Sequence, residues 1–563
     1  MVDDSRRFEQ SPRGSVLWRV MTDALAQALQ WWSPDAGTHP FASPSELLSA
    51  VERVRDTAYL VRTEDGAIAV GQGGDLYVAP HRRSDRDLPL IGVLPPLYPE
   101  WLGDRSFAET HGCRFPYVVG EMARGIATAE MVIAAAAAGL MGFFGSAGLR
   151  VASIVENIQH IQQTLGPSVH NWGANLIHSP QEPEVEQATV EAFLEHGVHR
   201  ISASAFMALA PAVVRYMASG LHRDEGGRIR RRNHIFAKVS HPRVAEVFMA
   251  PPPEQMLRNL SAAGFISAQE AELAARLPVA EDITVEADSG GHTDNRPLTA
   301  LFPTIVARRD ILAERHGYDR NIRIGAAGGL GTPVGLAAAL ALGAAYVLTG
   351  SVNQAAVESG LSVDGRLMLA GAGIDDVAMA PAADMFEMGV KVQVLRRGTM
   401  FAVRAQSLYE LYKTCSGFDD IPKAALERLE RDVFRAPLED IWDKTRTFFE
   451  TRNPAEIERA EREPKHRMAL VFRWYLFMGA HWTREVGNED RRVDYQIWCG
   501  PAMGAFNEWT RGSFLEQVEN RTVVQIGRNL LEGAAVITRA QQLRAFGVAI
   551  PPAAFGFRPR PLA

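Results

Sequence analysis

The chain has 563 residues and a formal net charge of −7, from 59 Lys plus Arg set against 66 Asp plus Glu. Its content of 47% hydrophobic and 22% charged residues can bury a large core, which excludes a disordered chain and a disulfide-stapled mini-protein. The mild negative charge argues against a nucleic-acid-binding protein, because such proteins need a basic surface. The three cysteines lie too far apart for a paired-cysteine metal site or a disulfide framework. We therefore expect no metal and a reducing, cytoplasmic environment.

Two segments bear on targeting and membranes. Residues 1–10 are polar and lack the apolar core of a signal peptide. Residues 131–144 are apolar and uncharged, but they are shorter than the roughly 20 residues that a membrane-spanning helix needs. We interpret this stretch as a buried helix that leads into a buried strand, and we predict a soluble protein with no membrane partner.

The pattern of elements predicts three regions. Residues 1–110 are rich in proline and read as a small N-terminal domain or cap. Residues 111–403 alternate short apolar runs with amphipathic stretches, which is typical of βα units on a parallel sheet. Residues 404–563 carry charged helical patterns, at Lys423–Phe434, Leu438–Glu450 and Pro454–Tyr475, and read as a mainly helical extension. We interpret its tryptophans, Trp474, Trp482, Trp498 and Trp509, as a helix-packing core, and this aromatic-rich extension suggests a homodimer.

The middle region contains eight candidate strands, and this number predicts an α/β fold with one (β/α)8 barrel. A doubly wound open sheet would need fewer strands and usually carries a nucleotide fingerprint on its first turn. The candidate strands are Pro116–Gly120, Gly139–Phe144, Trp172–Ile177, Arg200–Ala205, Ile235–Val239, Asp282–Asp288, Ile322–Ala326 and Ala345–Thr349.

Glycine-rich turns follow the last two candidate strands. The stretch IRIGAAGGLGTPVG places Gly328 and Gly329 before a helix that begins near Thr332, and the next strand ends at Gly350 and Ser351. Glycine lets the backbone approach a ligand, and free N–H groups at a helix start bind anions. In barrels the loops after strands seven and eight often bind phosphate. The alternative is a pair of tight turns without a ligand.

A histidine follows the sixth candidate strand. The run VEADSGGHTDN places the flexible pair Gly290 and Gly291 directly before His292, at the strand end that faces the mouth of a barrel. Imidazole can donate or accept a proton near neutral pH, so His292 is the candidate acid or base. The alternative is a loop histidine without a role.

Other polar residues lie on the same predicted rim. Asn175 lies in the strand WGANLI, where its amide could bind a flat polar ring. Lys238 stands in an otherwise apolar strand, and a buried cation needs a ligand, an acid or water. A salt bridge from Lys238 to Glu286 or Asp288 is nearly as good an interpretation. The backbone of Gly120, Glu121 and Met122 could approach one face of a cofactor.

Several of these motifs resemble a known family. The runs GEMARGIATAEMVIAAAAAGLMGFFGSAGL, WGANLI, IFAKVS, VEADSGGHTDN and AAGGLGTPVGLAAALALGAAYVLTGS occur in the order seen in FMN-dependent barrels of the nitronate monooxygenase and 2-nitropropane dioxygenase superfamily, which includes FabK-type enoyl reductases. The flanking runs VKVQVLRRGTMFAVRAQSLYELY and DYQIWCGPAMGAFN are similar to the PfaD group. These are trans-acting enoyl reductases of polyunsaturated fatty acid and polyketide synthases.

The resemblance implies an FMN whose phosphate is held near Gly328, Gly329, Gly350 and Ser351. It also implies that Glu121, Met122, Asn175 and Lys238 line the flavin ring and that His292 takes the position of the active-site histidine. NADPH or NADH would reduce the flavin, which would pass a hydride to an enoyl thioester on an acyl carrier protein. Lys238 would stabilise negative charge on the reduced ring. We carry over no role for Glu286, because its spacing to His292 differs from the usual pattern of the superfamily.

Two alternatives stay open. A nitronate monooxygenase would use the same histidine to abstract a proton, although a small nitroalkane would not need the long helical extension. A non-catalytic assembly subunit of a synthase would keep the barrel without its chemistry, and the intact glycine turns and rim histidine argue against it.

Overall fold

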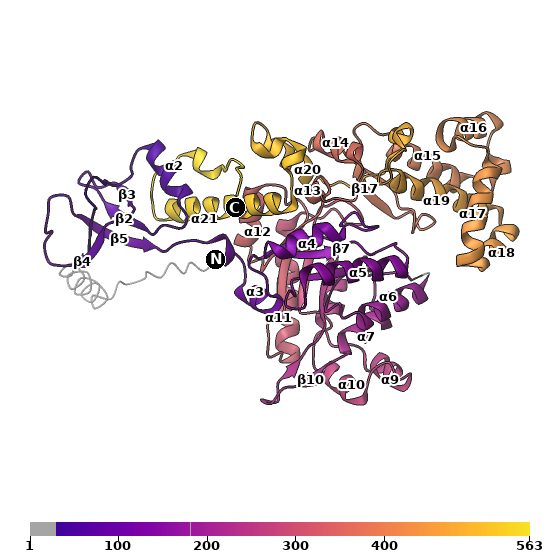
Figure 1. Cartoon of the computed structure of the whole chain (residues 1–563), viewed down its shortest axis with the longest axis horizontal. Helices are drawn as coiled ribbons and strands as arrows, with labels where there is room; N and C mark the ends of the chain where they lie inside the picture. Colours follow the sequence, from indigo (N-terminus) through magenta and orange to yellow (C-terminus); the bar gives the residue numbers. More distant parts are fainter. Residues whose placement is uncertain (1–29, 181, 563) are drawn as a thin grey trace, which may run out of the picture. The chain divides into compact units, whose positions relative to one another are not determined.

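The computed structural model describes residues 30–180 and 182–562. The chain forms two compact units (Figure 1). One unit combines the part of the chain up to Pro99 with Glu532–Phe557, and the other contains Glu100–Leu531 with the last residues from Arg558 onward. The described helices include none that is long and apolar enough to cross a membrane.

The larger unit contains a closed barrel of parallel strands in the order β12-β13-β14-β15-β6-β7-β8-β9. The ring closes where β15 pairs with β6, with Val347 opposite Tyr117. Each of the eight strands lies where the sequence predicts one, and the predicted barrel is therefore confirmed. The strands are β6 (Tyr117–Val119), β7 (Met141–Phe144), β8 (Trp172–Ile177), β9 (Arg200–Ser204), β12 (His234–Val239), β13 (Asp282–Glu286), β14 (Arg323–Ala327) and β15 (Val347–Thr349).

Helices connect the successive strands, as the parallel topology requires. The apolar segment at residues 131–144 is divided as predicted between a helix, α4, and the strand β7. The connecting helices are α4 (Ala129–Ala137), α5 (Val151–Leu165), α6 (Pro183–Glu195), α7 (Pro211–Ala218), α8 (Pro242–Met249), α9 (Glu254–Ala262), α10 (Ala268–Ala274), α11 (Leu298–His316) and α12 (Pro333–Ala341).

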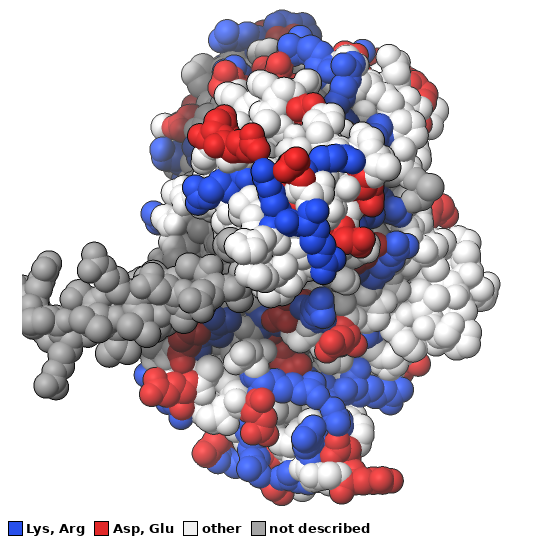
Figure 2. All heavy atoms as spheres, turned by 90° about the vertical axis from the view of Figure 1, so that its left-hand side faces the viewer, with Lys and Arg blue, Asp and Glu red and all other residues white. Residues whose placement is uncertain are grey.

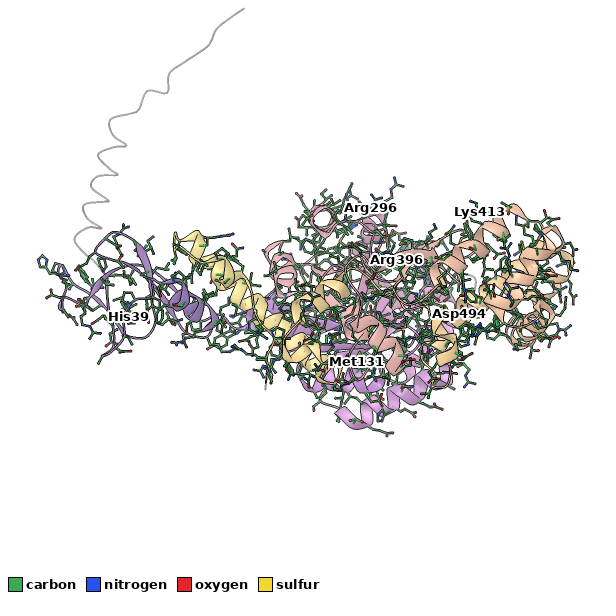
Figure 3. The ribbon with its side chains drawn as sticks, turned by 90° about the horizontal axis from the view of Figure 1, so that it is seen from above. His39, Met131, Arg296, Arg396, Lys413 and Asp494 are labelled. Carbon is green, nitrogen blue, oxygen red and sulfur yellow. The ribbon has the colours of Figure 1, made fainter. Side chains whose placement is uncertain are left out.

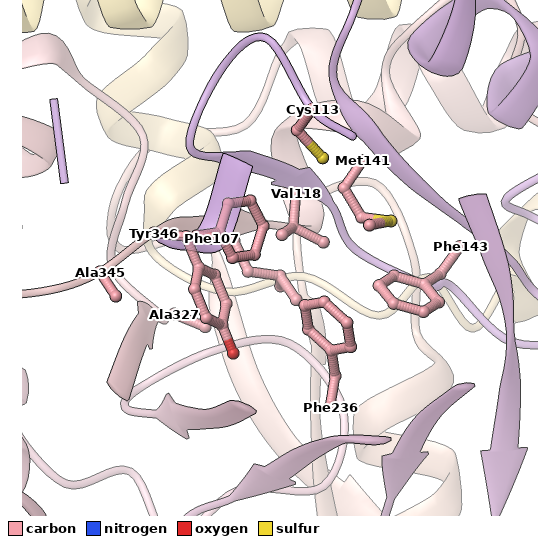
Figure 4. Close-up of a cluster of buried hydrophobic side chains, with 10 residues drawn as sticks. Phe107, Cys113, Val118, Met141, Phe143, Phe236, Ala327, Ala345 and Tyr346 are labelled. Carbon is pink, nitrogen blue, oxygen red and sulfur yellow. The ribbon is translucent and has the colours of Figure 1, made fainter. Parts of the chain in front are cut away.

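Aromatic side chains from α3 and from the barrel strands form part of a buried cluster (Figure 4). Phe107 comes from α3 (Arg105–His111) and stacks on Tyr346 with ring centroids 4.6 Å apart, while Phe143 meets Phe236 edge to face at 5.0 Å. At the strand starts, the buried carboxylate of Asp282 accepts hydrogen bonds from Arg323. Described side chains thus pack inside the barrel and at the strand starts, and the active sites of such barrels lie at the opposite, C-terminal end.

The part of the larger unit after the barrel consists of a β-hairpin and helices. The hairpin pairs β16 (Val377–Pro381) with β17 (Lys391–Leu395). The helical pattern predicted over Pro454–Tyr475 forms two helices, because a new helix begins at Pro464, which has no N–H to continue the hydrogen-bond ladder. The helical elements are α13 (Ser351–Gln354), α14 (Val363–Ala370), α15 (Phe401–Thr414), α16 (Lys423–Arg428), a π-helical segment (Leu429–Phe434), α17 (Leu438–Arg452), α18 (Pro454–Arg462), α19 (Pro464–Trp482) and α20 (Ala502–Thr510).

A buried carboxylate ties this helical part together. Asp494, labelled in Figure 3, pairs with Arg404 of α15 and accepts a hydrogen bond from Tyr475 of α19 at 2.8 Å. Arg491 lies 3.2 Å from its second oxygen. Because the carboxylate is fully buried, these partners are what makes its charge tolerable.

The smaller unit is built on a five-stranded sheet in the order β3-β2-β5-β1-β4. The buried Arg539 of α21 (Val523–Ala545) donates to the carbonyl oxygens of Leu94 and Val54, and Glu532 pairs with Arg55. These contacts join the C-terminal segment to the sheet within this unit. The other elements are β1 (Gln30–Ser33), α2 (Pro44–Glu52), β2 (Ala58–Arg62), β3 (Ile68–Gly71), β4 (Asp75–Val78) and β5 (Leu88–Leu94).

Candidate active site

A cavity of about 620 Å³ opens at the C-terminal ends of the barrel strands. All the candidate cofactor-binding and catalytic residues line it, so the fold brings together positions that are far apart in the chain. They are Gly120, Glu121, Met122, Asn175, Lys238, Gly290, Gly291, His292, Gly328, Gly329, Gly350 and Ser351.

Lys238 forms two ion pairs at the wall of this cavity. Its Nζ lies 3.1 Å from Oε1 of Glu121 and 3.2 Å from Oε1 of Glu286. Burial opposes the ammonium charge, but the two carboxylates outweigh it and raise the pKa of Lys238 above its ordinary value. The predicted salt bridge to Glu286 therefore exists, with Glu121 as the second partner in place of Asp288.

Glu121 is the more deeply buried of the two acids, with a side chain only 2% exposed. Apart from its ion pair with Lys238, neither of its carboxylate oxygens has a hydrogen-bond partner among the described residues. Buried carboxylate oxygens in proteins are normally hydrogen-bonded. A ligand with N–H or O–H groups in the cavity could satisfy them.

His292 meets an acid that the sequence did not reveal. Its Nε2 lies 3.3 Å from Oδ2 of Asp384, which follows β16. Burial opposes the charge on the imidazole, but the hydrogen bond to Asp384 and the charges of Asp384 and Glu286 raise the pKa of His292. Burial likewise opposes the carboxylate of Asp384, and His292 lowers its pKa. The pair thus favours imidazolium and carboxylate.

The glycine-rich turns have two different physical reasons for glycine. At Gly328, φ is +86° and a Cβ would lie 2.6 Å from the backbone of Ala287, so glycine permits close packing there. At Gly329, φ is +70° but a Cβ would meet nothing within 4 Å, and the space beside Gly350 is equally open. The open space beside these two turns is where a ligand group could approach the backbone.

A C-terminal segment that the sequence analysis did not assign to the site closes one side of the cavity. A Cβ on Gly290 would lie 2.8 Å from the backbone N of Cys499, and the N–H of Gly500 donates to Oγ of Ser351 at 3.1 Å. Gln354 donates to the carbonyl oxygen of Trp498 at 2.6 Å. This segment therefore fixes both the loop before His292 and the turn after β15.

The predicted helix-packing core contains Trp482, which is buried and packs edge to face on Trp474. Trp474 and Trp498 also line the cavity. For Trp474 the reason is helical spacing, since residues three and four apart share a face of a helix and α19 presents one such face to the cavity. That face consists of Leu470, Trp474, Phe477 and Met478.

Asn175 is placed at the cavity but is also part of the barrel framework. Its side-chain amide donates to the carbonyl oxygen of Ser202 and to Oγ of Ser204, both at 2.9 Å. These bonds hold β8 against β9.

Comparisons with known proteins agree with this architecture. Residues 106–427 match the family model described as nitronate monooxygenase, and residues 415–495 match the inserted helical domain of [acyl-carrier-protein] S-malonyltransferase. The crystal structure of the enoyl reductase domain of MlnA from Bacillus amyloliquefaciens superposes with a TM-score of 0.75 and 38% identity, covering 79% of this chain and 99% of that one.

Two curated proteins are similar over most of the chain. A polyunsaturated fatty acid synthase polypeptide from Thraustochytrium sp. is 47% identical over 452 residues, which are 79% of this chain and 30% of that protein. Polyketide biosynthesis protein PksE from Bacillus subtilis is 43% identical over 438 residues, which are 78% of this chain and 56% of that protein. The chain therefore spans only about a third to about half of the length of these relatives.

The match over more than half of the chain shows that the protein belongs to the nitronate monooxygenase family of barrel oxidoreductases. Within that family its sequence is PfaD-like, because it is similar to the polyunsaturated fatty acid synthase and polyketide biosynthesis proteins named above and to the enoyl reductase domain of MlnA.

Proposed function

We propose that the protein is an FMN-dependent enoyl reductase that acts in trans. It would use NADPH or NADH to reduce the α,β-double bond of enoyl thioesters carried on acyl carrier protein, in the cytoplasm. The observation that carries this proposal is the similarity to the enoyl reductase domain of MlnA, which covers 99% of that domain.

The residues at the cavity fit a flavin phosphate cofactor. The open space beside Gly329 and Gly350 would accept a phosphate against backbone N–H groups. The buried oxygens of Glu121 and the buried Oε1 of Gln354 have no hydrogen-bond partners among the described residues and would accept hydrogen bonds from a polar ring. When bound, the flavin supplies the hydride chemistry.

The side chains of the chain itself would orient the reactants and move the proton. Lys238 places a fixed positive charge on the cavity wall, where negative charge that develops during hydride transfer would be stabilised. His292 is held with its imidazolium form favoured, so it would donate a proton to the α-carbon of the substrate.

A carrier-protein substrate agrees with the helical part of the chain. Residues 415–495 match a helical domain named for an enzyme that acts on acyl carrier protein, and these helices supply the aromatic wall of the cavity.

Figure 2 shows acidic and basic side chains intermixed on the face it presents, with no broad basic surface there for nucleic acid.

Anaerobic flavin kinetics would test the function. The protein reconstituted with FMN should be bleached by NADPH or NADH, and the yellow colour should return on addition of an enoyl thioester of acyl carrier protein. Return of colour only with oxygen in the presence of a nitroalkane would favour a nitronate monooxygenase. A protein that does not bind FMN at all would favour the non-catalytic assembly subunit.

We also propose a homodimer, and one set of exposed apolar side chains suggests where two copies would meet. These side chains come from α14, the turn after it and the start of α15, which are Val363, Leu367, Ile374, Met400 and Val403. A contiguous patch of exposed apolar side chains often marks a protein contact. Sedimentation velocity of the unchanged protein and of Leu367→Asp would test this, and a monomeric unchanged protein would refute the dimer.

A further inference from the structure

Asp384 reaches His292 because the β16–β17 hairpin packs against the loop that carries the histidine. Gly291 and Gln393 of β17 exchange two backbone hydrogen bonds of 3.1 and 3.0 Å, directly next to His292. The side chain of Gln393 donates to Asp288 at 3.1 Å, which holds the start of the same loop. The hairpin therefore has a fixed register relative to the histidine.

The loop between β16 and β17 is anchored on both sides of Asp384. Arg473 of α19 donates to the carbonyl oxygen of Ala383 at 2.9 Å. Phe386 is buried, and Glu387 lies 3.1 Å from the buried His466 of α19. Asp384 is thus a carboxylate on a supported backbone, which distinguishes it from an acid on a free loop.

The two nitrogens of the His292 ring have different environments. Nδ1 is buried and has no hydrogen-bond partner among the described residues, whereas Nε2 faces Asp384, whose side chain is 53% exposed. Both residues line the cavity. Because Nδ1 is enclosed, Nε2 is the ring nitrogen that can give a proton to a molecule bound beside the pair, and to do so its hydrogen must leave the contact with Asp384.

We propose that Asp384 is a positioning residue for His292, which turns the Nε2 edge of the ring toward the cavity and keeps the imidazole in its protonated, proton-donating form. The inference rests on the function proposed above. In the step that it supports, the Nε2–H bond breaks as a C–H bond forms at the α-carbon, while the hydride supplies the electron pair at the β-carbon. The neutral ring then regains a proton from water beside the exposed carboxylate.

Other charges act on this pair, and they do not replace Asp384. Glu286 on β13 favours the charged imidazole and Lys238 on β12 opposes it, so these two effects on the pKa of His292 partly offset each other. Arg124, in the loop after β6, favours the ionised form of Asp384. Removal of the Asp384 charge should therefore lower the pKa of His292.

The test uses Asp384→Asn, which keeps the size of the side chain and removes its charge. The pKa of His292 would be measured by NMR on protein labelled with 13C at histidine Cε1, with the resonance assigned by its loss in His292→Ala. We expect this pKa to fall, and the alkaline limb of the pH profile for enoyl reduction to move to lower pH. The loss of rate should grow with pH and stay below the roughly 10²-fold expected from removal of a general acid.

Two further variants make the result specific. Asp375→Asn, an exposed aspartate before β16, should leave the titration of His292 and the pH profile unchanged. Asp384→Glu restores the charge and should recover part of the shift, which also covers the case in which Asp384→Asn does not fold. An unchanged pKa of His292 in Asp384→Asn would overturn the inference. A protein that shows the shift but reduces no enoyl thioester would refute the proposed function and leave the pairing intact.

Discussion

Replacing Lys238 by methionine should destabilise the larger unit markedly. At an effective dielectric constant of about 20, a charge pair at 3.1 or 3.2 Å attracts by about 5 kcal/mol, so the two pairs together give about 10 kcal/mol before other costs. Desolvation of the three charges and the repulsion between Glu121 and Glu286 offset much of this. Loss of one partner from a buried pair typically costs about 3–5 kcal/mol, because the remaining charge has no compensation.

Urea unfolding of the unchanged protein, Lys238→Met and the double variant Lys238→Met/Glu121→Gln would measure this effect at neutral pH. The single variant should unfold at a clearly lower urea concentration, and the double variant should recover part of the difference. A loss of less than about 1 kcal/mol in the free energy of unfolding is typical of a solvent-exposed ion pair. Such a small loss, or no recovery in the double variant, would refute the claim that these ion pairs stabilise the fold as buried pairs do.

Three further substitutions test the proposed proton donor His292, the glycine turn at Gly328 and the buried ion pair of Asp282 at the strand starts. His292→Ala should keep bound FMN but slow enoyl reduction by roughly 10²-fold or more in stopped-flow measurements, and an unchanged rate would remove it from the mechanism. Gly328→Ala should weaken FMN binding in fluorescence titrations because its Cβ would strike the backbone, whereas Gly317→Ala, which has φ +61° but open space, should not. Asp282→Asn should lower stability at neutral pH. Burial opposes the charge of Asp282, but the charge of Arg323 outweighs burial and lowers the pKa of this carboxyl. The carboxylate therefore contributes stability above its unfolded pKa, and this contribution is lost as the pH falls through the folded pKa. Equal urea midpoints for Asp282→Asn and the unchanged protein at neutral pH would contradict that assignment.

The barrel could be predicted because its strands are buried on both faces and read as short apolar runs between helical stretches. The predicted strand ends are less exact. Over Gly139–Phe144 the predicted start lies too early, because the residues before Met141, where the strand begins, have no polar side chain to mark the turn. The amphipathic pattern continues across Pro464, so the pattern alone does not place the boundary between α18 and α19 there.

A residue of the candidate site could be predicted only where the same short segment shows that it lies at the barrel rim and supplies a reactive side chain. His292 and Lys238 lie at or just after barrel strands, so the barrel count alone places them at the rim. Asp384 follows the short hairpin strand β16, and its contact with His292 depends on the pairing of β17 with Gly291. Trp474 could have been suspected from helical spacing, but no sequence pattern states which partner a helix face will meet.

The distribution of charge explains why the site would need glycine turns as well as side chains. The described charges around Lys238 and His292 include three carboxylates, from Glu121, Glu286 and Asp384, against one ammonium and one imidazole. A phosphate beside these acids would be repelled, because like charges at close range disfavour each other. Backbone N–H groups next to Gly329 and Gly350 offer partial positive charge at the cavity wall. The three acids can then pair with Lys238 and His292, while the backbone N–H groups would bind the phosphate.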